Sequence, residues 1–166
     1  IILSSSEKLF EQIEQDVRLD LHATYQPIRH LLSLLADYPA TQATDLEQRL
    51  ALLKPLSQAL TDNPDLASLY LGYGNGDFFM VRPLRTSDLK ARTQAPDAAA
   101  FQVWSIERDR SDGQVRSQSL FFDRDLMLLG RLDHPDEDYD PRTRAWFSSA
   151  RSEQEQITTE PYVFFS

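Results

Sequence analysis

The sequence predicts an α+β fold in which two helical segments precede an antiparallel sheet. Through about residue 61, apolar side chains recur every three or four positions, which is the period of an amphipathic helix. After Pro64 the pattern changes to short apolar runs separated by turns rich in Gly, Asn and Asp, which is typical of hairpin-connected strands. Strands and helices do not alternate along the chain, so a parallel βαβ sheet is not expected.

The first 36 residues are predicted to form one long helix. Ser4 and Glu7 have the spacing of a capping box, in which each side chain bonds the other residue's backbone N–H. Pro27 is expected to bend this helix, because it removes one backbone hydrogen bond. At 1.5 Å per residue the helix would be about 45–50 Å long, so we expect a second copy of the chain to cover part of its apolar seam. The seam consists of Phe10, Ile13, Val17, Leu21, Thr24, Ile28, Leu31 and Leu35.

A second helix is predicted over residues 45–61. Thr44 and Glu47 form a possible capping box at its start, and Pro55 interrupts it. Residues 62–65 end it, because Pro64 cannot continue a helix and disfavours helical backbone at the preceding residue. The apolar face of this helix consists of Leu46, Leu50, Leu53, Leu56 and Leu60.

Two hairpins are predicted after the second helix. The first pairs residues 69–73 with 78–82, and its connection contains Asn-Gly and Gly-Asp, which tolerate the positive φ of tight turns. The second pairs residues 101–107 with 115–122 around a turn containing Asp-Gly. The remaining predicted elements are a short helix and a fifth strand, over residues 123–132 and 157–165.

Composition excludes several classes of function. The chain has 17 Lys and Arg against 26 Asp and Glu, a net charge of −9, which disfavours binding to nucleic acid or to anionic lipid. It has no cysteine, so disulfides, thiolate nucleophiles and cysteine-bound zinc are ruled out. No apolar run approaches the roughly 20 residues of a membrane-spanning helix. Because the sequence lacks an initiator Met, we expect it to be part of a longer chain.

Three other patterns carry little functional signal. The glycines of residues 72–76 are followed by a strand, which indicates a hairpin turn and not a nucleotide loop. The three histidines, His22, His30 and His134, have no metal-binding spacing. The acidic run over residues 133–140 fits no calcium-loop template, so a solvated loop is favoured while a weak cation site stays open. We therefore expect no metal, no cofactor and no catalytic carboxylate pair.

The segment 139–147 is the most informative. Asp140 followed by Pro141 predicts a helix start, with a capping carboxylate and then proline at the first helical position. The segment also contains two arginines, a tryptophan and two further aromatic rings. A guanidinium donates a rigid fork of hydrogen bonds to an anion, and aromatic walls exclude water from it. This chemistry fits a pocket for an anionic small molecule, but equally an arginine that stacks on Trp146 and pairs with a neighbouring acid.

These residues resemble the signature of double Cache sensor domains, the extracytoplasmic regions of bacterial transmembrane receptors. The family pattern is approximately Tyr-Asp-Pro-Arg-x-Arg-x-Trp-Tyr, followed later by Pro-Tyr and a strand. Tyr139, Arg144, Trp146 and Tyr162 match it, whereas Phe147 stands where the family usually has Tyr. In members that bind amino acids, the Arg and Trp hold the ligand carboxylate and tyrosines help to hold its ammonium group. The resemblance therefore implies ligand contacts from these five residues.

The resemblance also implies an architecture and a location. Residues 1–64 would be a stalk helix plus a second helix, and residues 65–166 a membrane-distal, PAS-like Cache module that is incomplete at its C-terminal end. We expect a periplasmic sensor that is not an enzyme, binds an amino acid or organic acid, and forms a homodimer through its N-terminal helix. Its only membrane contact would be through spans outside this chain. The alternative is a dimerisation or scaffold module without a ligand of its own.

The resemblance carries one geometric condition. On a regular helix Arg144 and Trp146 would point about 200° apart and could not face one ligand. If both line a pocket, the backbone must be irregular or extended near Arg144.

Overall fold

The computed structural model describes residues 12–16, 26–34, 36–37, 39–109 and 111–153. Internal contacts divide the chain into two units, Ile1–Tyr38 and Pro39–Ser166. In the first unit residues 12–16 and 26–34 are helical, as predicted, and the rest of the predicted seam lies largely outside the described residues. Within the described ranges, none of the helices combines the length and the apolar character that spanning a membrane requires.

The second unit begins with a broken helical segment. It comprises η1 (Pro39–Gln42), α2 (Leu46–Arg49), η2 (Leu50–Leu52) and α3 (Leu53–Asp62). The helix predicted over residues 45–61 is interrupted, but the interruption predicted at Pro55 is wrong, because a 3₁₀ turn already separates α2 from α3 at residues 50–52. That break places Pro55 in the first turn of α3, where its missing N–H leaves no helical bond unmade. The predicted capping box at Thr44 is also wrong, since Asp45 is the cap and accepts a hydrogen bond from the Gln48 N–H at 2.9 Å.

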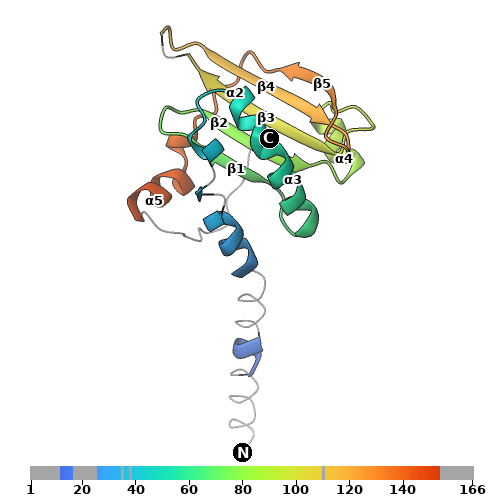
Figure 1. Cartoon of the computed structure of the whole chain (residues 1–166), viewed down its shortest axis with the longest axis vertical. Coiled ribbons are helices and arrows are strands. Elements are labelled where there is room, and N and C mark those ends of the chain that lie inside the picture. Colours follow the sequence, from blue (N-terminus) through green and yellow to red (C-terminus); the bar gives the residue numbers. More distant parts are fainter. Residues whose placement is uncertain (1–11, 17–25, 35, 38, 110, 154–166) are drawn as a thin grey trace, which may run out of the picture. The chain divides into compact units, whose positions relative to one another are not determined.

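The predicted α+β class is confirmed by an antiparallel five-stranded sheet in the order β1-β2-β3-β4-β5 (Figure 1). Both predicted hairpins are present, and the arrangement is compatible with a PAS-like fold. The β1–β2 turn closes through a hydrogen bond from the Tyr73 N–H to the Asp77 carbonyl at 2.9 Å, with Gly76 at a φ of 91°. The strands are β1 (Leu69–Gly72), β2 (Phe78–Pro83), β3 (Phe101–Arg108), β4 (Val115–Phe122) and β5 (Leu128–Asp133).

The short helix predicted over residues 123–132 is wrong, because this stretch is a tight turn followed by β5. The carboxylate of Asp123 accepts hydrogen bonds from the N–H groups of Asp125 and Met127, which reverses the chain and leaves Leu126 at a φ of 60°. The following apolar run then pairs with β4 instead of coiling. The fifth strand predicted over residues 157–165 lies outside the described residues.

A short helix that sequence patterning did not predict, α4 (Ser87–Arg92), lies in the connection between β2 and β3. Thr86 caps it by accepting a hydrogen bond from the Leu89 N–H at 3.2 Å. Its six residues are too few to show a helical period. This helix matters because it covers part of the sheet.

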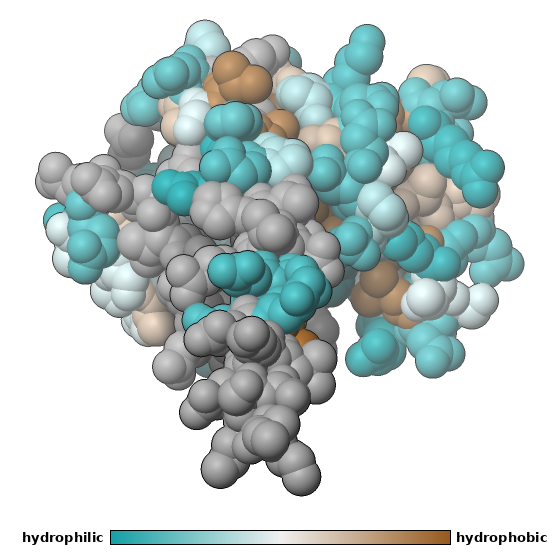
Figure 2. Space-filling view, turned by 90° about the horizontal axis from the view of Figure 1, so that it is seen from below, coloured by the Kyte–Doolittle hydropathy of each residue, from teal (hydrophilic) through white to brown (hydrophobic). Residues whose placement is uncertain are grey.

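The two faces of the sheet are covered differently. Helix α3 contacts β2 and lies across one face (Figure 1), where alternate strand residues such as Phe79, Val81 and Val103 are fully buried. The other face carries two smaller clusters. In one, Phe78, Met80, Trp104 and Ile106 pack with Tyr139, and in the other Leu84, Ala99 and Phe121 pack near α4. In the coloured part of the face that Figure 2 shows, most side chains are hydrophilic and the apolar ones are scattered. The buried apolar residues of this unit lie mainly on the strands and on the helical segment over residues 52–60.

Candidate functional site

The segment predicted to bind a ligand has an interrupted backbone. Asp140 caps η3 (Pro141–Thr143) by accepting a hydrogen bond from the Arg142 N–H at 2.9 Å, which confirms the predicted helix start. Arg144 is then extended, with φ −92° and ψ 142°, before α5 (Ala145–Glu153) begins. The condition for Arg144 and Trp146 to serve one site is therefore met, since they do not lie on one continuous helix.

Arg142 forms an ion pair with Asp140 of the same segment. Its Nη2 lies 2.6 Å from an oxygen of Asp140, and the pair is partly exposed. The hydrogen bond from Arg142 holds the pKa of the Asp140 carboxyl below its usual value. The guanidinium also lies over Gly76, where an added Cβ would approach its Cζ to 2.8 Å. Arg142 thus pairs with a neighbouring acid, the structural alternative left open for the arginines of this segment.

Arg144 is placed differently. Its guanidinium carbon lies 4.6 Å from the centre of the Tyr139 ring, and its Nε is buried without a hydrogen-bond partner. Among the residues that the structure describes, no carboxylate forms an ion pair with it. A buried guanidinium N–H without an acceptor costs free energy, and a bound anion would remove that cost.

Trp146 lies close to Arg144 in sequence and packs on the sheet. Its ring meets that of Tyr70 edge-on, with centroids 5.0 Å apart, and that of Phe147 at 5.7 Å. The indole touches β1 at Gly72, where a Cβ would lie 2.6 Å from the ring. Its Nε1 is buried and has no hydrogen-bond partner in the described part of the chain. A second unused donor therefore lies in the same segment as Arg144.

Tyr139, whose ring packs against the Arg144 guanidinium, is only 6% exposed. Its ring packs on Phe78 and Trp104, with centroids 4.9 and 5.3 Å away. Its backbone N–H donates to Glu137 at 2.8 Å, and its carbonyl accepts from Arg108 at 2.9 Å. The structure thus joins Tyr139 to Arg144 and sets Phe147 against Trp146, while Tyr162 lies outside the described residues.

A buried ion pair holds the loop that carries Tyr139. Arg49 of α2 donates to Asp77 at 2.6 Å, and the two side chains are 1% and 2% exposed. The other oxygen of Asp77 accepts from the Arg108 N–H at 2.8 Å, and the Arg108 side chain donates to the Tyr139 carbonyl. The Arg49 guanidinium also stacks on Tyr73, and burial raises the pKa of that phenol. Helix α2, the β1–β2 turn and the Tyr139 loop are therefore joined in one network.

A hollow of about 210 Å³ lies on the same sheet face, between α4 and strands β2–β5. A chain of hydrogen bonds crosses it, from Arg82 to Gln102 at 2.7 Å, on to Ser119 at 2.7 Å, and from Ser119 to His134 at 2.8 Å. Trp104, Leu89 and Leu132 supply apolar walls. The remaining polar or charged side chains that line it are Arg92, Thr93, Gln94 and Glu137.

Sequence reasoning missed this hollow because its residues meet only through strand register. Arg82 pairs across strands with Gln102, and Trp104 pairs with Ser119. One signal was present, since polar residues at buried positions interrupt the apolar pattern of β3 and β4. Neither this hollow nor a larger, open one of about 1190 Å³ beside α3 and α4 is lined by Arg144.

The described residues contain no cluster of three or more His, Asp or Glu side chains arranged to hold a metal ion. The polar groups that line the hollow on this sheet face are guanidinium, amide, hydroxyl, imidazole and carboxylate groups, which bind by hydrogen bonding and charge. The arrangement suits reversible binding of a small molecule.

Comparison with known proteins finds a relative among the signalling enzymes by name. The chain is 29% identical over 107 residues to a protein named adenylate cyclase 1 of Rhizobium meliloti (strain 1021), and the match covers 64% of this chain and 16% of that protein. The chain thus spans a small part of the length of its relative. No family model matches the sequence, and no solved structure matches it.

Proposed function

We propose that this chain is the ligand-sensing module of a bacterial membrane signalling protein and that it binds a small anionic metabolite, an amino acid or an organic acid. The observation that carries the proposal is the buried Nε of Arg144, which has no acceptor among the described residues and lies beside the ring of Tyr139. A carboxylate there would accept charge-assisted hydrogen bonds in a site that is partly shielded from water.

Two further observations support the proposal. The indole N–H of Trp146 is a second buried donor without a partner among the described residues. The segment therefore offers a guanidinium donor and an indole donor, the two groups that hold the ligand carboxylate according to the Cache resemblance. The relative's name denotes a cyclase, and this chain aligns with 16% of it, as a regulatory stretch of a signalling protein would. In this proposal the chain binds its ligand without transforming it.

Location and assembly belong to the same proposal. The module would lie on the periplasmic side of the inner membrane, anchored through spans outside this chain. Two copies would pair through their N-terminal helices, whose apolar seam needs a partner. Ligand binding would shift the balance between two arrangements of those helices, which requires that the ligand bind one arrangement more tightly than the other.

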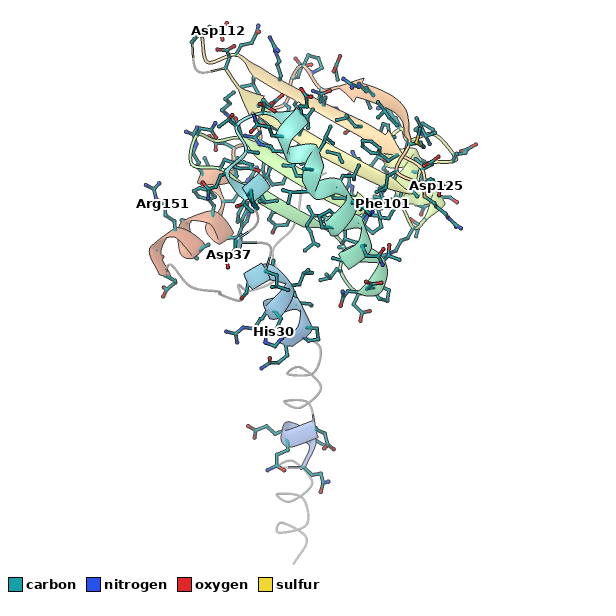
Figure 3. The ribbon with its side chains drawn as sticks, in the orientation of Figure 1. His30, Asp37, Phe101, Asp112, Asp125 and Arg151 are labelled. Carbon is teal, nitrogen blue, oxygen red and sulfur yellow. The ribbon has the colours of Figure 1, made fainter. Side chains whose placement is uncertain are left out.

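The test is isothermal titration of the chain with a panel of amino acids and organic acids. We expect at least one binder, and we expect Arg144→Ala to weaken it by about 1.5–3 kcal/mol, the scale of a hydrogen bond to a charged group. Arg151→Ala is the matched control, because Arg151 is an exposed arginine of α5 (Figure 3).

Thermal unfolding of the same variants separates sensor from scaffold. A sensor keeps its stability when Arg144 is truncated and loses affinity. If Arg144→Ala instead destabilises the fold and no compound in the panel binds, the scaffold alternative is correct and the sensing proposal is wrong.

A further inference from the structure

The hollow under α4 contains two arginines without an acidic partner. Arg82 of β2 donates its Nε–H to Gln102, and among the described residues neither Arg82 nor Arg92 forms an ion pair with a carboxylate. Burial lowers the pKa of Arg82, and the nearby charge of Arg92 lowers it further. Two like charges facing one small hollow repel each other, and an anion between them would remove that repulsion.

The rest of the lining limits what the anion can be. Leu89, Leu132 and the ring of Trp104 form apolar walls, which suit a carbon skeleton better than a bare inorganic ion. Glu137 also lines the hollow and would repel a second acidic group on the ligand. A volume of about 210 Å³ admits a small molecule only.

We propose that this hollow is a binding site for a short monocarboxylate, with the carboxylate held by Arg82 and Arg92 and the apolar tail against Trp104. The hydrogen-bonded row from Arg82 through Gln102 and Ser119 to His134 holds Arg82 in place across β2, β3 and β4 and the residue that follows β5. The inference rests on the proposed function in that it takes the chain to be a ligand-binding module, but it uses none of the residues of the Arg144 segment.

The chain offers internal reporters for the test. It has two tryptophans, so a ¹⁵N-edited NMR spectrum contains two indole N–H signals, and Trp104 lines the hollow whereas Trp146 does not. The probe is butyrate, and its uncharged isostere butyramide is the ligand control. We expect butyrate to move the Trp104 indole and Arg82 Nε–H signals saturably, and butyramide to leave them in place.

Substitutions locate the charge contact. Arg92→Gln should weaken butyrate binding by about 10-fold or more, the loss expected for one hydrogen bond to a charged group. Arg92 is exposed on α4, so its substitution does not endanger the fold. Arg131→Gln, on the exposed surface of β5, is the matched control and should change the affinity less than about twofold.

Three results would overturn the assignment: no movement of either signal with butyrate, equal movement with butyramide, or equal affinities in Arg92→Gln and Arg131→Gln. The two proposals fail separately. If butyrate is inert but a panel compound binds in a manner that depends on Arg144, the assignment of the hollow is wrong and the proposed function stands. If butyrate binds through Arg92 but no panel compound depends on Arg144, the hollow stands and the role of Arg144 is wrong.

Discussion

Gly72 shows how one missing side chain lets the candidate site form. An added Cβ would lie 2.6 Å from the Trp146 ring and 2.9 Å from Pro141, so Gly72→Ala must push α5 or η3 away from the sheet. We expect Gly72→Ala to lower the free energy of unfolding by about 1–3 kcal/mol, the usual cost of overpacking. Urea denaturation measures this loss. Gly74→Ala is the control, because a Cβ there meets nothing within 4 Å, and equal effects of the two changes would contradict the packing described.

Asp140 couples the stability of the Tyr139–Arg144 segment to pH. The hydrogen bond from Arg142 holds its folded-state pKa below the unfolded value of about 3.9. A depressed pKa contributes stability above the unfolded pKa, and this contribution is lost as the pH falls through the folded pKa. Asp140→Asn keeps a good helix cap and removes only the charge.

We therefore expect Asp140→Asn to be less stable than the unmodified chain at pH 7, with the difference shrinking below about pH 4. Urea unfolding across this pH range measures it. Asp125→Asn, which changes an exposed carboxylate in the turn before β5 (Figure 3), is the control for charge alone. If the difference in unfolding free energy between Asp140→Asn and the unmodified chain instead grows as the pH falls, the ion pair with Arg142 does not set the pKa of Asp140.

The elements were predictable wherever local patterning decides them. The two hairpins follow from apolar runs flanking Gly-rich turns, and the start of η3 follows from Asp140 and Pro141. The residues of β5 were wrongly predicted to be helical because an apolar run as short as 126–129 fits a helix or a strand equally well. The hydrogen bonds that the Asp123 carboxylate accepts stabilise a turn there instead of a helix. The hollow under α4 could not be predicted from the sequence, because Arg82, Gln102, Trp104 and Ser119 come from separate strands and are brought together only by the pairing register of the sheet.

The network that joins α2 to the β1–β2 turn depends on a pair that no local pattern reveals, because Arg49 and Asp77 lie 28 positions apart. Removing one partner leaves a buried charge uncompensated, so we expect Asp77→Ala to destabilise the chain by about 3–5 kcal/mol. Chemical denaturation checks this, with Asp125→Ala as the exposed control. Because Arg108 links Asp77 to the Tyr139 carbonyl, ligand affinity should fall as well. A loss below about 1 kcal/mol, typical of a surface pair, would mean that the network does not hold this loop.

The whole unit distributes its polar groups unevenly. One sheet face is packed against α3, while the other carries the Tyr139–Trp146 cluster and the hollow under α4. Both regions contain guanidinium groups without an acidic partner among the described residues, although the chain carries 26 acidic residues against 17 basic ones. Arg82 and Arg144 are half-buried on this face, and in the two proposals an external anion would supply the acidic partner that each of them lacks there.

In the proposed function, Arg144 binds the acidic group of a small metabolite. Titration calorimetry of the unmodified chain beside Arg144→Ala tests it most directly. We expect a saturable binder whose affinity falls at least about 10-fold in Arg144→Ala while both proteins unfold at the same temperature. A binder that both proteins hold equally tightly would contradict it.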